Sequence, residues 1–254
     1  MKKETIKYLL SEEKQAFKGW DFSYLNGRWE SDELPWSYEE FVRKYLNTDS
    51  VILDMGTGGG ELLLSFNHPF ELTSVTESYE PNINLCFKTL SPKGIMVYPI
   101  KEDDILEGVP SFKFDIVLNR HESFNVSEVK RILKNNGVFI TQQVGAFNNF
   151  DLATFFDPNH KSQYPDLTLD KTVEKLENSG FKILYKNEFF PELKFYDLGA
   201  VAYFAKIINW EFLNFSIINY LDKFEKLELI LKRNGFIKST EHRFIIIARK
   251  QNID

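Results

Sequence analysis

The sequence predicts an α/β protein with a doubly wound, seven-stranded, mostly parallel sheet. Short runs rich in β-branched residues alternate with helical patterns from about residue 50 to residue 190, and this alternation is typical of a parallel sheet with helices on both faces. A length of 254 residues suits one large domain with added segments better than two full domains. Both observations favour a single core.

The expected strands are short apolar runs that lie between helix and turn signals. Their ranges are 50–54, 72–77, 95–100, 114–119, 137–144, 182–189 and 243–248. The expected helices cover 62–66, 82–90, 128–133 and 168–179. Ser37 and Glu40 have the spacing of a capping box, which predicts a further helix that runs through Leu46.

Two regions lie outside a minimal sheet. Residues 1–48 hold an aromatic-rich stretch, and residues 191–240 form a long connection between strands six and seven that includes a helix over 220–234. Stretches of this length between strands tend to be functional. We therefore expect an N-terminal helical lid segment (1–48), a core (49–190), an insertion that forms a second lid or substrate region (191–240) and the last strand of the core sheet (241–254).

Charge and composition restrict the possible functions. The net charge of -6 disfavours nucleic acid as a partner, because a phosphate-binding surface is basic. The single cysteine, Cys86, excludes an internal disulfide and favours the cytoplasm. The four histidines lack the spacing of metal ligands. No signal peptide and no membrane span is expected, and the oligomeric state is not predicted.

A glycine-rich turn follows the first expected strand. Residues 54–60 read Asp-Met-Gly-Thr-Gly-Gly-Gly. Glycines permit tight turns and the close approach of a ligand, and the carboxyl ends of the strands are where such sheets bind ligands. The dinucleotide pattern G-x-G-x-x-G does not fit, because Glu61 or Leu63 occupies the position of the third glycine. A nicotinamide-dependent oxidoreductase is therefore disfavoured.

The spacing acid-x-Gly-x-Gly-x-Gly, from Asp54 to Gly60, resembles that of class I S-adenosylmethionine (SAM)-dependent methyltransferases. The resemblance covers residues 48–190 and the final strand. It implies a Rossmann-like sheet whose last strand is antiparallel, with SAM as cofactor and S-adenosylhomocysteine as product. Residues 114–124 and 243–250 are also similar to an uncharacterised bacterial branch, which implies a fold and a cofactor but no acceptor.

The resemblance also implies cofactor contacts. Glu77, at the end of strand two, would bind the ribose hydroxyls, unless it is only an exposed strand-end charge. Asp103 or Asp104 would lie near the adenine, unless both lie in a solvated loop; Asp104 is preferred because apolar Ile105 follows it. Asp54 would interact with the ammonium of the methionyl group, directly or through water, or would only accept backbone N–H groups of the loop. The expected cofactor-binding residues are Asp54, Gly56, Thr57, Gly58, Gly60, Glu77, Ser78, Asp103, Asp104, Ile105 and Asn119.

The turn after strand four is unusually polar and is the first place to look for catalytic residues. Methyl transfer needs in-line approach, exclusion of water and, for a protonated acceptor, a base. His121 could take a proton from a hydroxyl or amine, with Glu122 orienting it, or could simply bond to the backbone or cofactor. Gln142 and Gln143, at the end of strand five, could reach the acceptor or satisfy neighbouring backbone groups.

Other features narrow the reaction. Trp20, Tyr24, Trp29 and Trp36 could form an aromatic lid, although packing is favoured for most of them. No Asn/Asp-Pro-Pro-Tyr/Phe motif follows strand four, so similarity to amino-directed DNA methyltransferases is lacking, and Cys86 is not placed to act as a nucleophile. We predict a methyltransferase that acts on O or N of a small molecule. The alternatives are an RNA methyltransferase and a protein that binds SAM without catalysis.

Overall fold

The computed structural model of the chain describes residues 1–17, 21–101 and 105–252, and these residues form two compact units. The sheet unit comprises Trp36–Val144, Leu167–Glu188 and Phe244–Asp254, and the accessory unit comprises Met1–Pro35, Gly145–Asp166 and Phe189–Arg243. This division differs from the one expected from sequence chiefly in two places, and residues 189–190 and 241–243 also belong to the accessory unit. Residues 36–48 belong to the sheet unit, and residues 145–166 belong to the accessory unit.

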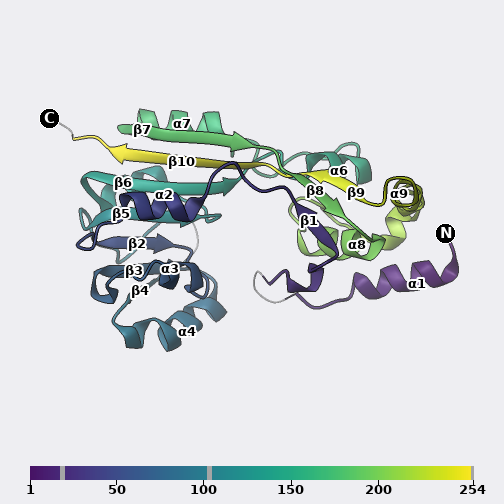
Figure 1. Ribbon diagram of the computed structural model, residues 1–254, viewed down its shortest axis with the longest axis horizontal. Coiled ribbons are helices and arrows are strands. Elements are labelled where there is room, and N and C mark those ends of the chain that lie inside the picture. Colours follow the sequence, from purple (N-terminus) through teal and green to yellow (C-terminus); the bar gives the residue numbers. More distant parts are fainter. Residues whose placement is uncertain (18–20, 102–104, 253–254) are drawn as a thin grey trace. The chain divides into compact units, whose positions relative to one another are not determined.

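The sheet unit is built on a seven-stranded sheet with the strand order β4-β3-β2-β5-β6-β10-β7 (Figure 1). Its strands are β2 (Ile52–Met55), β3 (Thr73–Glu77), β4 (Met96–Pro99), β5 (Phe114–Arg120), β6 (Leu133–Val144), β7 (Phe181–Phe189) and β10 (Arg243–Lys250). β2 pairs in parallel with β3 and β5, while the last strand, β10, is antiparallel. The predicted Rossmann-like fold class and all seven predicted strands are confirmed.

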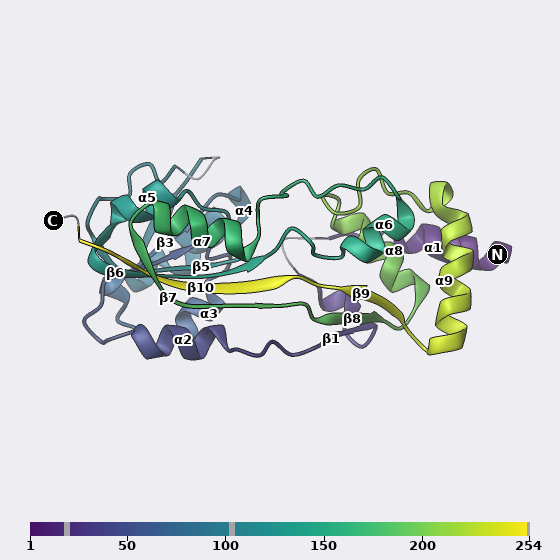
Figure 2. The same ribbon diagram turned by 90° about the horizontal axis from the view of Figure 1, so that it is seen from above.

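Helices cover both faces of this sheet. They are α2 (Tyr38–Tyr45), α3 (Glu61–Ser65), α4 (Glu80–Thr89), α5 (Val126–Ile132) and α7 (Leu169–Asn178). Buried side chains from α2, α3 and α4 form one apolar cluster with the sheet, and those from α5 and α7 form another. Figure 2 shows α2 and α3 on one side of the sheet and α5 and α7 on the other. Successive strand residues belong to opposite clusters, as the pleat of a strand requires.

Side-chain caps mark the starts of α2, α5 and α7. The Ser37 hydroxyl accepts the Glu40 backbone N–H at 3.2 Å, and the Thr168 hydroxyl accepts the Lys171 N–H at 3.3 Å. Such caps satisfy backbone donors that have no partner within the helix. The predicted helix after Ser37 is confirmed, and α2 ends at Tyr45, one residue before the predicted end.

The accessory unit combines a small antiparallel sheet with helices. Its elements are α1 (Lys3–Glu12), β1 (Trp29–Ser31), α6 (Phe150–Phe156), β8 (Glu192–Phe195), α8 (Leu198–Ile207), α9 (Leu221–Asn234) and β9 (Ile237–Thr240). The strand order is β1-β8-β9. The apolar run that begins at Leu198 becomes the buried helix α8, which packs on α1 and α9. None of the helices that the structure describes is long and apolar enough to cross a membrane.

Arg28 is the centre of a polar network in the accessory unit. Its guanidinium donates to Asp197 Oδ1 at 2.7 Å and Oδ2 at 2.9 Å, to Glu12 Oε2 at 3.1 Å and to the Tyr8 hydroxyl at 3.1 Å. Glu12 is only 5% exposed. A buried carboxylate of this kind needs a charged partner, so Arg28 ties α1 to the segment that precedes α8.

We expect Arg28→Ala to lower the free energy of unfolding by about 1–3 kcal/mol, because charge-assisted hydrogen bonds are lost and Glu12 is left buried without its cation. Urea denaturation followed by circular dichroism measures the change. Lys232→Ala is the control, since Lys232 pairs with Glu228 on an exposed turn of α9. Equal stability of Arg28→Ala and the wild type would contradict the structural role of the network.

Candidate active site

The predicted glycine loop lies at the carboxyl end of β2 and leads into α3. Gly56 and Gly58 each have φ of 62°, and Gly60, the N-cap of α3, has φ of 82°. Glycine adopts this region with less strain than residues that carry a Cβ atom. A Cβ atom on Gly60 would also lie 2.9 Å from Leu90 Cδ1. The loop conformation therefore favours glycine at these positions for steric reasons alone.

Glu77, the last residue of β3, is bound to the glycine loop. Its carboxylate is 4% exposed and accepts backbone N–H groups from Gly58 at 2.8 Å and from Ser78 and Tyr79 at 3.0 Å each. Asn82 Nδ2 lies 3.5 Å from Oε2. Glu77 is thus not an exposed strand-end charge, because it connects the turn after β2 to the start of α4.

Asp54 belongs to β2 and lies just before the glycine loop. Its Oδ2 accepts the Thr57 hydroxyl at 2.7 Å. Burial raises the pKa of Asp54 to about 7, and the negative charge of Glu77 adds to the rise; the bond from Thr57 and the positive charge of Arg120 oppose it. Both the neutral and the ionised carboxyl are therefore populated near neutral pH.

Asn119 lies beside the loop, because β5 pairs with β2 and places Asn119 opposite Met55. Its Oδ1 accepts from the Thr141 hydroxyl at 2.9 Å and from Gln143 Nε2 at 2.5 Å. Among the buried side-chain nitrogen and oxygen atoms of the described residues, Asn119 Nδ2 has no hydrogen-bond partner, whereas the Tyr38 hydroxyl lies beside the backbone of Asn119. Buried polar atoms are normally paired, so Asn119 Nδ2 is available to a polar ligand.

The two predicted catalytic residues follow β5. His121 is exposed and adopts φ of 66°, and its backbone N–H donates to the Gln142 carbonyl at 2.8 Å. Glu122 lies against the glycine loop, since a Cβ atom on Gly56 would be 2.4 Å from Glu122 Oε2. The turn after β5 therefore meets the turn after β2 at one edge of the sheet.

The remaining predicted residues lie at or beyond the edge of this group. Ser78 is exposed and donates its backbone N–H to Glu77. Ile105 is 60% exposed. Asp103 and Asp104, like Trp20 of the predicted aromatic lid, lie outside the described residues. The part of the chain that the structure describes contains no group of three or more His, Cys, Asp or Glu side chains that could hold a metal ion.

Tyr38, which is not among the site residues expected from the sequence, also contributes to this edge. Tyr38 is 6% exposed and its hydroxyl lies in the field of Asp54 and Arg120. Trp36 donates its indole N–H to Gln142 Oε1 at 2.8 Å. Tyr38 lies four residues before buried Val42 on α2, and that helical spacing predicts that both side chains face the sheet.

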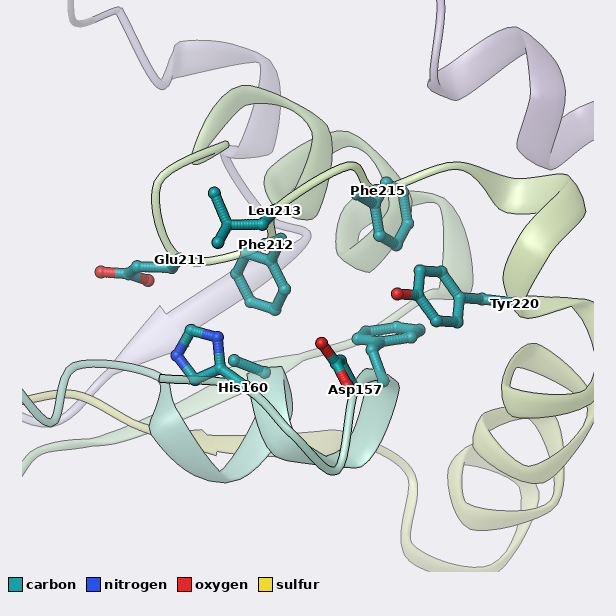
Figure 3. A pocket seen from close by; sticks show the side chains of 9 residues that line it. Asp157, His160, Glu211, Phe212, Leu213, Phe215 and Tyr220 are labelled. Atoms are coloured by element: carbon teal, nitrogen blue, oxygen red, sulfur yellow. The ribbon is translucent and has the colours of Figure 1, made fainter. Parts of the chain in front are cut away.

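A small hollow exists in the accessory unit, lined by Ala153, Phe156, Asp157, His160, Glu211, Phe212, Leu213, Phe215 and Tyr220 (Figure 3). Its cavity volume of about 10 Å³ is close to the smallest that holds one water molecule. The Phe156 ring contacts the rings of Phe215 and Tyr220, with centroids 5.4 Å and 5.3 Å apart. The hollow is a gap in an aromatic core and is too small for a substrate.

Comparisons with solved structures identify the fold. A candidate methyltransferase from Bacillus halodurans C-125 is 16% identical with a TM-score of 0.57, over 85% of this chain and 99% of that one. The YcgJ protein of Bacillus subtilis gives the same identity and coverage with a TM-score of 0.55. A SAM complex of phosphoethanolamine N-methyltransferase 2 from Haemonchus contortus is 13% identical with a TM-score of 0.51, over 85% of this chain and 52% of that one.

No family model and no curated protein matches the sequence. At these identities the solved structures show the fold alone. The strand order, the antiparallel last strand and the helices on both faces are those of class I SAM-dependent methyltransferases. The chain therefore has the methyltransferase form of the Rossmann-like fold, with the glycine loop after β2, the first strand of that fold.

Asp54 gives a pH-dependent prediction for stability. Its pKa of about 7 in the folded chain exceeds the ordinary 3.8, so between these values the folded state binds more protons and stability falls as pH rises. Asp54→Asn cannot ionise but retains an oxygen for the Thr57 hydroxyl. We expect the variant to be more stable than the wild type by about 1–3 kcal/mol at about pH 8, and to lose this advantage near pH 4.

Urea denaturation at both pH values measures the difference, with Asp49→Asn at an exposed position as the control. If the difference in free energy of unfolding between Asp54→Asn and the wild type were the same at both pH values, Asp54 would ionise without penalty. That result would contradict the effect expected from its burial.

Proposed function

We propose that the protein is a SAM-dependent methyltransferase of the cytoplasm that methylates O or N of a small molecule. One observation carries the proposal: the Glu77 carboxylate at the end of β3 bonds to the Gly58 N–H in the loop after β2. The carboxyl ends of adjacent strands in an open α/β sheet form the ligand-binding edge. An acid and a glycine loop at this edge suit a ligand with hydroxyl and ammonium donors and no phosphate.

The residues at the edge match the chemical groups of SAM. Asp54 carries the negative charge that attracts a cationic ligand, and Asn119 Nδ2 is a buried donor without a partner. Glu77 has about four acceptor positions, of which three hold backbone N–H groups at 3.0 Å or less. One ribose hydroxyl can take the fourth position if it displaces the long bond from Asn82 Nδ2, 3.5 Å, whereas two would also require the Gly58 bond to break. Asp103, Asp104 and Ile105 are proposed to surround the adenine.

SAM supplies a methyl group activated by its sulfonium. The protein then has to align the acceptor, exclude water and receive a proton from an O–H or N–H acceptor. His121 is proposed for the proton, because it lies at the turn after β5 and is exposed. Glu122, which lies against Gly56, is proposed to hold this turn beside the glycine loop and to orient His121.

The proposed acceptor is a small molecule because the chain is acidic, with a net charge of -6. An RNA substrate requires several phosphate contacts from Lys and Arg, and such binding weakens steeply with salt. Phosphoethanolamine N-methyltransferase, one of the structurally similar proteins, is named for a small amine substrate. That name supports the class of acceptor and gives no identity for it.

Two glycine substitutions test the cofactor site. Gly58 and Gly94 both have positive φ, 62° and 98°, and a Cβ atom on either would meet no heavy atom within 4 Å. Gly58→Ala and Gly94→Ala therefore introduce similar backbone strain of about 1–2 kcal/mol. Gly58 lies in the loop, whereas Gly94 precedes β4 at the opposite end of the strands. We expect Gly58→Ala alone to weaken SAM binding, by about tenfold or more.

Calorimetric titration with SAM and with S-adenosylhomocysteine measures the effect. The wild type should bind SAM in the micromolar range, about -8 kcal/mol. Absence of binding to both compounds would refute the proposed function. Equal weakening in both variants would show that the loss comes from strain and not from the loop. RNA binding that falls steeply with salt would favour an RNA methyltransferase, and SAM binding without turnover on any acceptor would favour a non-catalytic protein.

A further inference from the structure

A chain of hydrogen bonds connects three side chains of the sheet unit. The Trp36 indole N–H donates to Gln142 Oε1 at 2.8 Å, and Gln142 Nε2 lies 3.2 Å from His121 Nε2. Trp36 precedes α2, Gln142 belongs to β6, and His121 follows β5. Gln142 is 3% exposed, so its amide has little freedom to choose other partners.

The direction of this chain follows from the chemistry of its first member. An indole N–H can only donate, so the Gln142 atom that faces Trp36 has to be the oxygen. The amide nitrogen therefore faces His121, and it can only donate as well. His121 Nε2 has to accept, and a neutral imidazole with a lone pair on Nε2 carries its proton on Nδ1. Trp36 thus favours, through Gln142, the tautomer of His121 that has its lone pair on Nε2.

The same glutamine also holds the backbone of His121. The His121 N–H donates to the Gln142 carbonyl at 2.8 Å, and the preceding residue, Arg120, lies opposite Gln142 in the β5–β6 register. His121 has a left-handed backbone conformation, φ 66°. The main chain and the ring of His121 are therefore both positioned by Gln142.

We propose that Trp36 and Gln142 are positioning residues that keep Nε2 as the proton-accepting atom of His121. The catalytic role of this arrangement rests on the proposed methyltransferase function. As the acceptor O–H or N–H bond breaks, its proton goes to Nε2 and replaces the bond from Gln142. The electron pair of the acceptor forms the new bond to the methyl carbon, and the pair of the broken C–S bond stays on sulfur. A histidine with its lone pair on Nδ1 would present an N–H at Nε2 and could not take this proton.

The tautomer is measurable without knowledge of the acceptor. The full-length protein, labelled with ¹⁵N histidine, is studied by ¹⁵N–¹H correlation NMR at about pH 8, where an ordinary histidine is neutral. The two ring nitrogens then report which one carries the proton, and His121→Asn assigns the signals among the four histidines. We expect wild-type His121 to be protonated on Nδ1.

Two substitutions should change that result in different ways. Gln142→Glu replaces the amide with a carboxylate, which can accept from Trp36 and from His121 but cannot donate, so the His121 proton should move to Nε2. Trp36→Phe removes the donor that fixes the amide, so His121 should become a mixture of both tautomers. Trp29→Phe, in the accessory unit, is the control and should leave the tautomer unchanged.

Wild-type His121 protonated on Nε2 would overturn the proposal. Trp36→Phe and Gln142→Glu signals identical to those of the wild type would also overturn it, because a packing role alone does not set a tautomer. Circular dichroism verifies folding of each variant, and Trp36→Phe alone suffices as the test if Gln142→Glu does not fold. If the tautomers are as expected but the protein does not bind SAM, the proposed function is refuted and the positioning role of Trp36 and Gln142 stands. If the protein binds SAM but His121 has the other tautomer, the positioning role is refuted and the proposed function stands.

Discussion

The bond from the Gly58 N–H to Glu77 is the contact on which the edge of the sheet depends. Strand pairing alone brings the ends of β2 and β3 together but leaves the turns beyond them undefined. A buried carboxylate must find donors, and Glu77 finds them in the turns after β2 and β3. Because the loop glycines have left-handed conformations that few other residues adopt, this one acid can hold the loop without side-chain packing inside it.

Much of the sheet unit was predictable from sequence because its determinants are local. Runs such as Val51 to Leu53 are too apolar to lie anywhere but in the core, and the alternation of strands and helices defines a parallel sheet. Ser37 marks a helix start through a bond to a residue only three positions away. The glycine loop could be recognised because backbone strain strongly favours glycine at those positions.

Most of the accessory unit could not be predicted in this way, although the expected helix over 220–234 is present as α9. β1 is only three residues long, and it pairs with β8, more than 160 residues further along the chain. Nothing local specifies such a pairing. The same limit applies to the site: Glu77 could be placed by its position at a strand end, whereas the bond between Trp36 and Gln142 joins residues 106 positions apart. A sequence shows which side chains can donate or accept hydrogen bonds, but it does not show which distant residues the fold brings together.

Asp54 distinguishes this edge from a merely packed end of the sheet. A carboxyl whose pKa is raised to about 7 by burial makes the ligand-free fold less stable than an apolar residue or an amide would. Natural proteins tolerate such groups where function requires them. A cationic ligand beside Asp54 would favour the ionised form, and a donor such as Thr57 already does so in part. The penalty in the folded chain and the attraction that a cation would feel there have the same origin, because both come from a negative charge with too little solvent around it.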